Sequence, residues 1–162
     1  MRFDGGLSAK HHDALLREIS DYTSRDDALP VDSLCFGGGT SSLTPHSIAT
    51  VIDEFGPLPT DSAQIAIEAY PTHATPGQLA DLRAVGVNRV SLGSETLDRK
   101  LPKKLGRRYS PEQAVESVLA AKAAGFDAVD AKPIFGIPGQ DNATFLAAVR
   151  ECLTMGVDQI SA

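Results

Sequence analysis

The chain has 162 residues, of which 15 are lysine or arginine and 21 are aspartate or glutamate, so its formal net charge is −6. Hydrophobic residues at 42% and charged residues at 22% are the proportions of a folded globular protein, but a complete barrel of eight β/α units, which takes about 250 residues, does not fit. The acidic balance argues against non-specific nucleic-acid binding, and no apolar run approaches the ~20 residues of a membrane span.

Five segments have the apolar spacing of helices. The first runs over residues 11–25, the next three begin at prolines that follow a serine or threonine, and the last runs over 145–153. A hydroxyl residue before a first-turn proline is a typical helix start, and Gln78 and Gln113 stand where a capping box has its glutamine. The expected helix ends are glycines, at Gly56, Gly86, Gly125 and Gly156.

Strands are expected at residues 33–36 and 64–69 and after three of these glycines. Residues 86–91 (GVNRVS), 125–130 (GFDAVD) and 156–161 (GVDQIS) share a pattern: glycine, an apolar residue, asparagine or aspartate, a variable residue and a β-branched residue. Alternating helices and strands predict parallel strands with right-handed crossovers. An open doubly wound sheet and a β/α barrel both satisfy this, and the near-identical repeat favours the barrel. We expect one α/β domain over 1–162.

The chain has two cysteines, Cys35 and Cys152, in no metal-ligand spacing. This excludes a disulfide framework, a zinc finger and a self-contained cysteine-ligated iron–sulfur site. We expect both thiols to be small core residues, and the four histidines to lie at the surface without a metal. Free thiols and the lack of an export signal predict a cytoplasmic protein.

Sites in parallel α/β folds form at the carboxyl ends of strands. One such end carries the run Gly37, Gly38, Gly39, Thr40, where backbone groups can approach a ligand, although a tight structural turn explains the run equally well. Glu68 ends another strand and is either a contact to a ligand's hydroxyl or amine or a solvated carboxylate. A basic cluster over residues 99–108 is either a solvated surface or an anion site that includes Arg107.

Five ordered motifs resemble those of radical S-adenosylmethionine (SAM) enzymes of the oxygen-independent coproporphyrinogen III oxidase group, with its heme-chaperone and methyltransferase relatives. Residues 36–43 (FGGGTSSL) resemble the family's FGGGTPSL, residues 68–71 (EAYP) its EANP, and residues 87–93 (VNRVSLG) its VNRISLG. Residues 105–108 (LGRR) and 135–140 (FGIPGQ) match two further blocks in the right order. The five motifs together span most of the chain.

The resemblance implies a partial β/α barrel of the radical SAM type and a role in heme metabolism with a tetrapyrrole substrate. In the family a [4Fe–4S] cluster on a Cys-x3-Cys-x2-Cys loop reduces SAM, and the resulting radical abstracts hydrogen from the substrate. By position, Gly38, Gly39 and Thr40 would face the methionine end of SAM, and Glu68 would contact the same cofactor. Arg107 matches an arginine at a second SAM or substrate position.

Four positions depart from the family pattern. Ser41 replaces a proline, Leu97 replaces a phenylalanine, Glu95 stands where the family has a glutamine, and Lys132 stands where it has a ligand-contacting aspartate. Glu95 and Lys132 complete the expected cofactor-binding set, while no catalytic residue is assigned. Because the exchange of aspartate for lysine reverses a charge, it indicates a different substrate or a loss of function.

The cluster motif is the largest gap, since no cysteine precedes Cys35 and the family's loop would lie upstream of residues 11–25. We expect the chain to be the interior of a larger barrel that does not itself hold the cluster. An incomplete barrel would expose strand edges and self-associate through them.

Three functions remain open at this point. The first is a fragment of a radical SAM oxidoreductase related to coproporphyrinogen oxidase, inactive by itself. The second is a degenerate non-catalytic member that binds SAM or heme. The third is a β/α lyase that uses Lys132 as a Schiff-base lysine, which explains none of the five motifs.

Overall fold

The structure is a computed structural model that describes residues 5–37, 45–57, 59–98, 101 and 105–162, with side chains described from residue 9 onward. The helices are α1 (Gly5–Thr23), α2 (Pro45–Glu54), the 3-10 helix η1 (Pro71–His73), α3 (Pro76–Ala84), α5 (Pro111–Ala123) and α6 (Asn142–Thr154). The strands are β1 (Val31–Phe36), β2 (Pro59–Ala69), β3 (Arg89–Gly93), β4 (Ala128–Lys132) and β5 (Gln159–Ile160).

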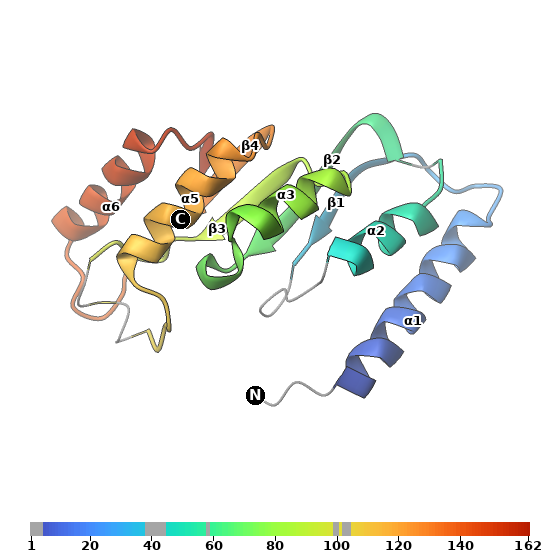
Figure 1. Ribbon diagram of the computed structural model, residues 1–162, viewed down its shortest axis with the longest axis horizontal. Helices are drawn as coiled ribbons and strands as arrows, with labels where there is room; N and C mark the ends of the chain where they lie inside the picture. Colours follow the sequence, from blue (N-terminus) through green and yellow to red (C-terminus); the bar gives the residue numbers. More distant parts are fainter. Residues whose placement is uncertain (1–4, 38–44, 58, 99–100, 102–104) are drawn as a thin grey trace.

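All five strands form one parallel sheet in the order β1-β2-β3-β4-β5. Each crossover advances by one strand in the same direction, so right-handed connections put the helices on one face of the sheet (Figure 1). A doubly wound sheet would reverse its strand order and carry helices on both faces. The expected barrel-type arrangement is therefore confirmed.

The expected helix ends are largely confirmed. Ser110 and Gln113 form a complete capping box at the start of α5. At α3, Thr75 accepts a hydrogen bond from the Gln78 backbone, but the Gln78 side chain accepts one from the Thr75 hydroxyl instead of from the backbone. The four helix-ending glycines all have positive φ angles, between 57° and 96°. The first helix and the second strand begin earlier than expected, at Gly5 and Pro59.

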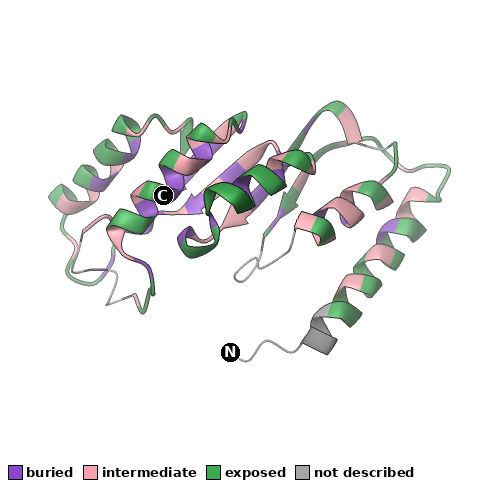
Figure 2. Ribbon diagram, in the orientation of Figure 1, coloured by how far each residue is buried: buried purple, intermediate pink, exposed green. Residues whose placement is uncertain are grey.

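The hydrophobic core lies between the sheet and its helices, where Figure 2 shows the buried residues. Val90 and Leu92 of β3 and Val129 of β4 are buried there, with Leu79 of α3 and Val118 of α5 packed in the same cluster. Because strand side chains alternate between the two faces, the residues between these apolar positions point to the helix-free face of the sheet. That face carries the polar residues from which the site is built.

The prediction that Cys35 is a core residue is wrong, whereas Cys152 is buried as expected. Phe36 of β1 belongs to the core cluster, and Leu34 packs against it. Cys35 lies between these two residues, so strand alternation turns its side chain to the open face. The apolar character of residues 34–36 suggested a strand buried on both sides, but the structure covers β1 with helices on one side.

In two of the three repeats, the third residue ties its strand to the one before it through its side chain. Asn88, just before β3, accepts a hydrogen bond from the backbone N–H of Ile65 on β2 (2.8 Å), and its amide donates to the Ala63 carbonyl (2.8 Å). Asp158, just before β5, accepts from the N–H of Val129 on β4 (2.9 Å). In both cases the residue's own N–H also donates to the same preceding-strand residue. The third residue of these repeats thus fixes the register between its own strand and the preceding one.

Asp158 should stabilise the protein through this hydrogen bond and through its charge. The ammonium group of Lys122, 2.8 Å away, and the Val129 N–H hold the pKa of Asp158 below its ordinary value of 3.8. We expect Asp158→Ala to lower the free energy of unfolding at pH 7 by about 1 kcal/mol, the usual contribution of a lost hydrogen bond. Asp158→Asn should cost less, because an amide oxygen can accept from Val129 as Asn88 does from Ile65. Urea unfolding measures both.

The pH dependence separates the two contributions of Asp158. A carboxyl whose folded pKa is depressed adds stability above its unfolded pKa and loses it as the pH falls through the folded value. The wild-type advantage over Asp158→Asn should therefore be present at pH 7 and shrink below about pH 4. An advantage that is the same at pH 7 and pH 2.5 would contradict a role for the charge.

The two thiols should differ sharply in reactivity. Burial raises the pKa of the Cys152 thiol, whereas Cys35 is exposed. Because the thiolate is the reactive form, we expect a thiol reagent such as dithionitrobenzoate to label Cys35 rapidly in the folded chain and Cys152 only on unfolding. In Cys35→Ser the rapid phase should disappear. Rapid labelling of folded Cys35→Ser would show that Cys152 is not enclosed.

Candidate functional site

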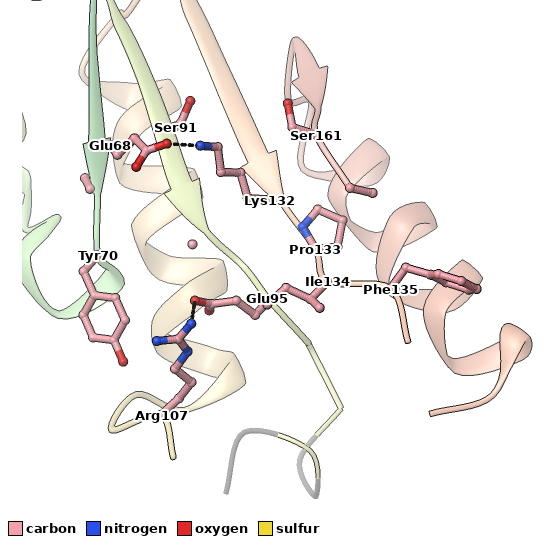
Figure 3. Close-up of a pocket in the computed structure, with 13 residues that line it drawn as sticks. Glu68, Tyr70, Ser91, Glu95, Arg107, Lys132, Pro133, Ile134, Phe135 and Ser161 are labelled. Carbon is pink, nitrogen blue, oxygen red and sulfur yellow. Dashed lines mark hydrogen bonds and ion pairs between the residues drawn. The ribbon is translucent and has the colours of Figure 1, made fainter. Parts of the chain in front are cut away.

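A cavity of about 460 Å³ lies at the carboxyl ends of β2, β3 and β4 (Figure 3). Its polar lining comes from strand ends and from the segments that follow them: Glu68, Ser91, Glu95, Arg107, Lys132 and Ser161. Tyr70, Ile134 and Phe135 add apolar surface. The cavity therefore occupies the place where parallel α/β folds bind their ligands.

An ion pair between Glu68 and Lys132 spans the upper part of the cavity in Figure 3. Glu68 is near the end of β2, and Lys132 is the last residue of β4, so the pair reaches across the intervening strand β3. Register places Ser91 beside Glu68 and Gly93 beside Lys132. These small residues leave the space above β3 in which the two long side chains meet. Both side chains stay partly exposed, at 44% for Glu68 and 37% for Lys132.

A second ion pair joins Glu95 and Arg107 at 3.0 Å. The Glu95 side chain is only 10% exposed, and its Oε2 atom is buried with no hydrogen-bond partner among the residues that the structure describes. A side chain at Gly93 would place its Cβ 3.3 Å from Glu95 Oε1, so glycine makes room for this carboxylate. An unsatisfied buried acceptor costs about 1–3 kcal/mol, which a donor from a bound ligand would recover.

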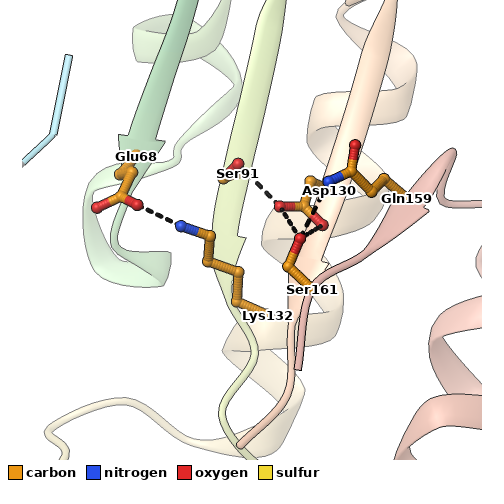
Figure 4. A network of polar contacts seen from close by, with 6 residues as sticks. All are labelled: Glu68, Ser91, Asp130, Lys132, Gln159 and Ser161. Atoms are coloured by element: carbon orange, nitrogen blue, oxygen red, sulfur yellow. Dashed lines mark hydrogen bonds and ion pairs between the residues drawn. The ribbon is translucent and has the colours of Figure 1, made fainter. Parts of the chain in front are cut away.

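A buried carboxylate, Asp130 of β4, lies beside the cavity (Figure 4). It accepts hydrogen bonds from the hydroxyl groups of Ser91 on β3 (3.0 Å) and of Ser161, just after β5 (3.0 and 3.1 Å). These three residues were not among the expected site residues, although their positions in the sequence carry a signal. Each is the sixth residue of its repeat, so equivalent positions of three repeats meet in one network.

The structure brings together four of the seven residues expected to bind the cofactor: Glu68, Glu95, Arg107 and Lys132 all line the cavity. The other three, Gly38, Gly39 and Thr40, lie outside the described residues. Gly37 is described, and a side chain there would place its Cβ 3.3 Å from Glu68 Oε2. The glycine run therefore starts beside the Glu68 carboxylate. Glu68 lies in an ion pair rather than being simply solvated.

The charged side chains of the cavity suit SAM, whose ammonium and sulfonium groups are cationic and whose carboxylate is anionic. Glu68 and Glu95 can face the cationic groups and the ribose hydroxyls, and Arg107 can hold a carboxylate. The buried Oε2 of Glu95, which has no hydrogen-bond partner in the part of the chain that the structure describes, is an acceptor that such a ligand would satisfy.

The residues of this chain do not fit a [4Fe–4S] cluster held by three thiolates, because the chain has two cysteines and Cys152 is buried. Among the described residues, no group of three or more histidine, cysteine, aspartate or glutamate side chains could hold a metal ion. Within the same residues, none of the helices is both long and apolar enough to cross a membrane.

Comparison with known proteins identifies relatives of the chain. It is 32% identical over 166 residues to the oxygen-independent coproporphyrinogen III oxidase of Pseudomonas aeruginosa, covering 98% of the chain and 36% of that protein. It is 33% identical over 154 residues to the heme chaperone HemW of Mycobacterium tuberculosis, covering 92% of the chain and 39% of that protein. The chain thus spans little more than a third of the length of these two relatives.

Solved structures show the same fold. The coproporphyrinogen III oxidase HemN of Escherichia coli superposes with a TM-score of 0.82 at 24% identity, over 100% of this chain and 39% of that one. The methylornithine synthase PylB superposes with a TM-score of 0.65 at 22% identity, over 89% of this chain and 42% of that one. The sequence pattern of the Radical SAM superfamily matches residues 10–152. The chain therefore belongs to the radical SAM superfamily.

Proposed function

We propose that the cavity binds SAM and that the chain is the SAM-binding part of an oxidoreductase related to oxygen-independent coproporphyrinogen III oxidase. The observation that carries this proposal is the cavity at the strand ends, where Glu68, Glu95 and Arg107 converge and one Glu95 oxygen has no hydrogen-bond partner among the described residues. Bound SAM supplies the adenosyl group from which the hydrogen abstraction of this superfamily starts.

Each residue has a proposed task. Glu95, which is buried and held in place by its ion pair with Arg107, accepts a hydrogen bond from the cofactor at its Oε2 atom. Arg107 also presents a planar guanidinium that can bind a carboxylate of the cofactor or substrate in a bidentate manner. Glu68 contacts the same cofactor together with Gly38, Gly39 and Thr40. We assign no residue of this chain to the cluster.

The proposed substrate is a tetrapyrrole, and the proposed compartment is the cytoplasm. Two of the relatives carry names that refer to coproporphyrinogen or heme. The apolar surface of Tyr70, Ile134 and Phe135 is suited to a flat, largely apolar ligand, with Arg107 available for a propionate. The two free cysteines support the proposed compartment, because disulfides are rare in the reducing cytoplasm.

Two other functions remain to be weighed. A degenerate member that binds SAM or heme without catalysis is favoured by Lys132, which reverses the charge of the family's aspartate and forms an ion pair with Glu68. The Schiff-base lyase is disfavoured by the same contact. A nucleophilic lysine lies desolvated or beside another cation, whereas Lys132 is partly exposed and pairs with a carboxylate.

Binding of SAM to the 162-residue chain tests the proposal. Equilibrium dialysis should detect binding, and Arg107→Ala should weaken it about 10-fold or more, since a hydrogen bond to a charged group contributes about 1.5–3 kcal/mol. The matched control is Arg108→Ala, because Arg108 is an exposed neighbour that does not line the cavity. Thermal melts establish that each variant is folded.

The outcomes separate the candidate functions. Binding of SAM that depends on Arg107 but not on Arg108 supports the proposal. Absence of SAM binding, or an equal loss in both variants, contradicts it. Binding of heme alone, followed by its absorbance, would favour the degenerate heme-binding alternative.

A further inference from the structure

We propose that Lys132 is a tethered competitor for Glu68, so that its ammonium group occupies the carboxylate that a bound cofactor needs and thereby lowers the affinity of the site. The inference rests on the proposed function, since it takes Glu68 as a cofactor contact. It goes further by assigning Lys132 a role in setting affinity rather than a direct contact to the cofactor.

Lys132 lies where its side chain can reach Glu68 across β3. The residue ends β4 on the same open face as Glu68 of β2, and at the two register positions the strand between them presents Ser91 and Gly93. Figure 4 shows the lysine side chain extending across β3 to the Glu68 carboxylate. The ion pair therefore closes over the part of the cavity that a cofactor contact to Glu68 would use.

Asp130 is a carboxylate nearer to Lys132 along β4, but its hydrogen bonds are made by other residues. Asp130 precedes Lys132 by two residues on the same face and accepts hydrogen bonds from the hydroxyls of Ser91 and Ser161 on both of its oxygens. With Asp130 satisfied by neutral donors and buried at 6% exposure, the charge of Lys132 is directed to the more exposed Glu68.

The two ion pairs of the cavity differ in how readily a ligand can open them. The Glu95 side chain is 10% exposed, so breaking its contact to Arg107 would leave a buried charge without a partner. The Glu68–Lys132 pair is partly exposed, and pairs in this setting contribute about 0–1 kcal/mol. A cofactor group can therefore displace Lys132 at small cost, and the lysine ammonium can return to water.

A double-mutant cycle on SAM binding tests this inference. Lys132→Met removes the ammonium but keeps the length of the side chain, and we expect SAM to bind about two- to five-fold more tightly to this variant. In a Glu68→Gln background the same substitution should leave the affinity unchanged, because the carboxylate for which Lys132 competes is gone. Lys132→Arg should keep the weaker, wild-type affinity.

Lys122→Met is the matched control. Lys122 is similarly exposed, at 33%, and pairs with the Asp158 carboxylate outside the cavity. Its replacement removes one positive charge from the chain, as Lys132→Met does, and should leave SAM affinity unchanged. A gain in this control equal to that of Lys132→Met would overturn the inference in favour of a general charge effect.

The remaining outcomes distinguish the inference from the proposed function. If wild-type chain binds SAM and Lys132→Met binds it equally or more weakly, the inference fails while the proposed function stands. A gain that persists in the Glu68→Gln background also overturns it. If neither wild type nor any variant binds SAM, the proposed function and the inference both fail.

Discussion

The register between neighbouring parallel strands is the constraint on which the rest of the structure depends. Asn88 and Asp158 fix this register by binding the backbone of the preceding strand at the amino end of the sheet. A slip of one residue would turn every side chain of a strand to the opposite face. Because the register holds, the apolar residues of β3 and β4 lie under the helices, and Ser91 and Asp130 meet on the open face.

The same register creates the cavity. With Glu68 beside Ser91 and Gly93 beside Lys132, small residues of the middle strand lie between longer residues of its neighbours. A side chain at Gly93 would occupy this space and crowd Glu95, whose Oε1 would lie 3.3 Å from the new Cβ. The Glu68–Lys132 part of the site is thus a consequence of the strand register, whereas Glu95 and Arg107 come from the segment that follows β3.

Most of the fold and part of the site could be predicted from the sequence. Helix caps, terminal glycines and the repeat are local signals, so the alternating elements and their parallel arrangement followed from short stretches of chain. The exposure of Cys35 and the partners of Lys132 and Asp130 depend on which face of the sheet the helices cover and on side chains far away in sequence. Ser91, Asp130 and Ser161 stand at equivalent positions of the repeat. That these positions meet in one network could be seen only once the register of the strands was known.

The two charged departures from the family pattern each have a partner in the cavity. Lys132, where the sequence resemblance leads us to expect an aspartate, pairs with Glu68, and Glu95, where it leads us to expect a glutamine, pairs with Arg107. In each pair one carboxylate faces one cation, so the two pairs together add no net charge to the cavity. The pairing therefore determines which charged groups a ligand meets in the cavity.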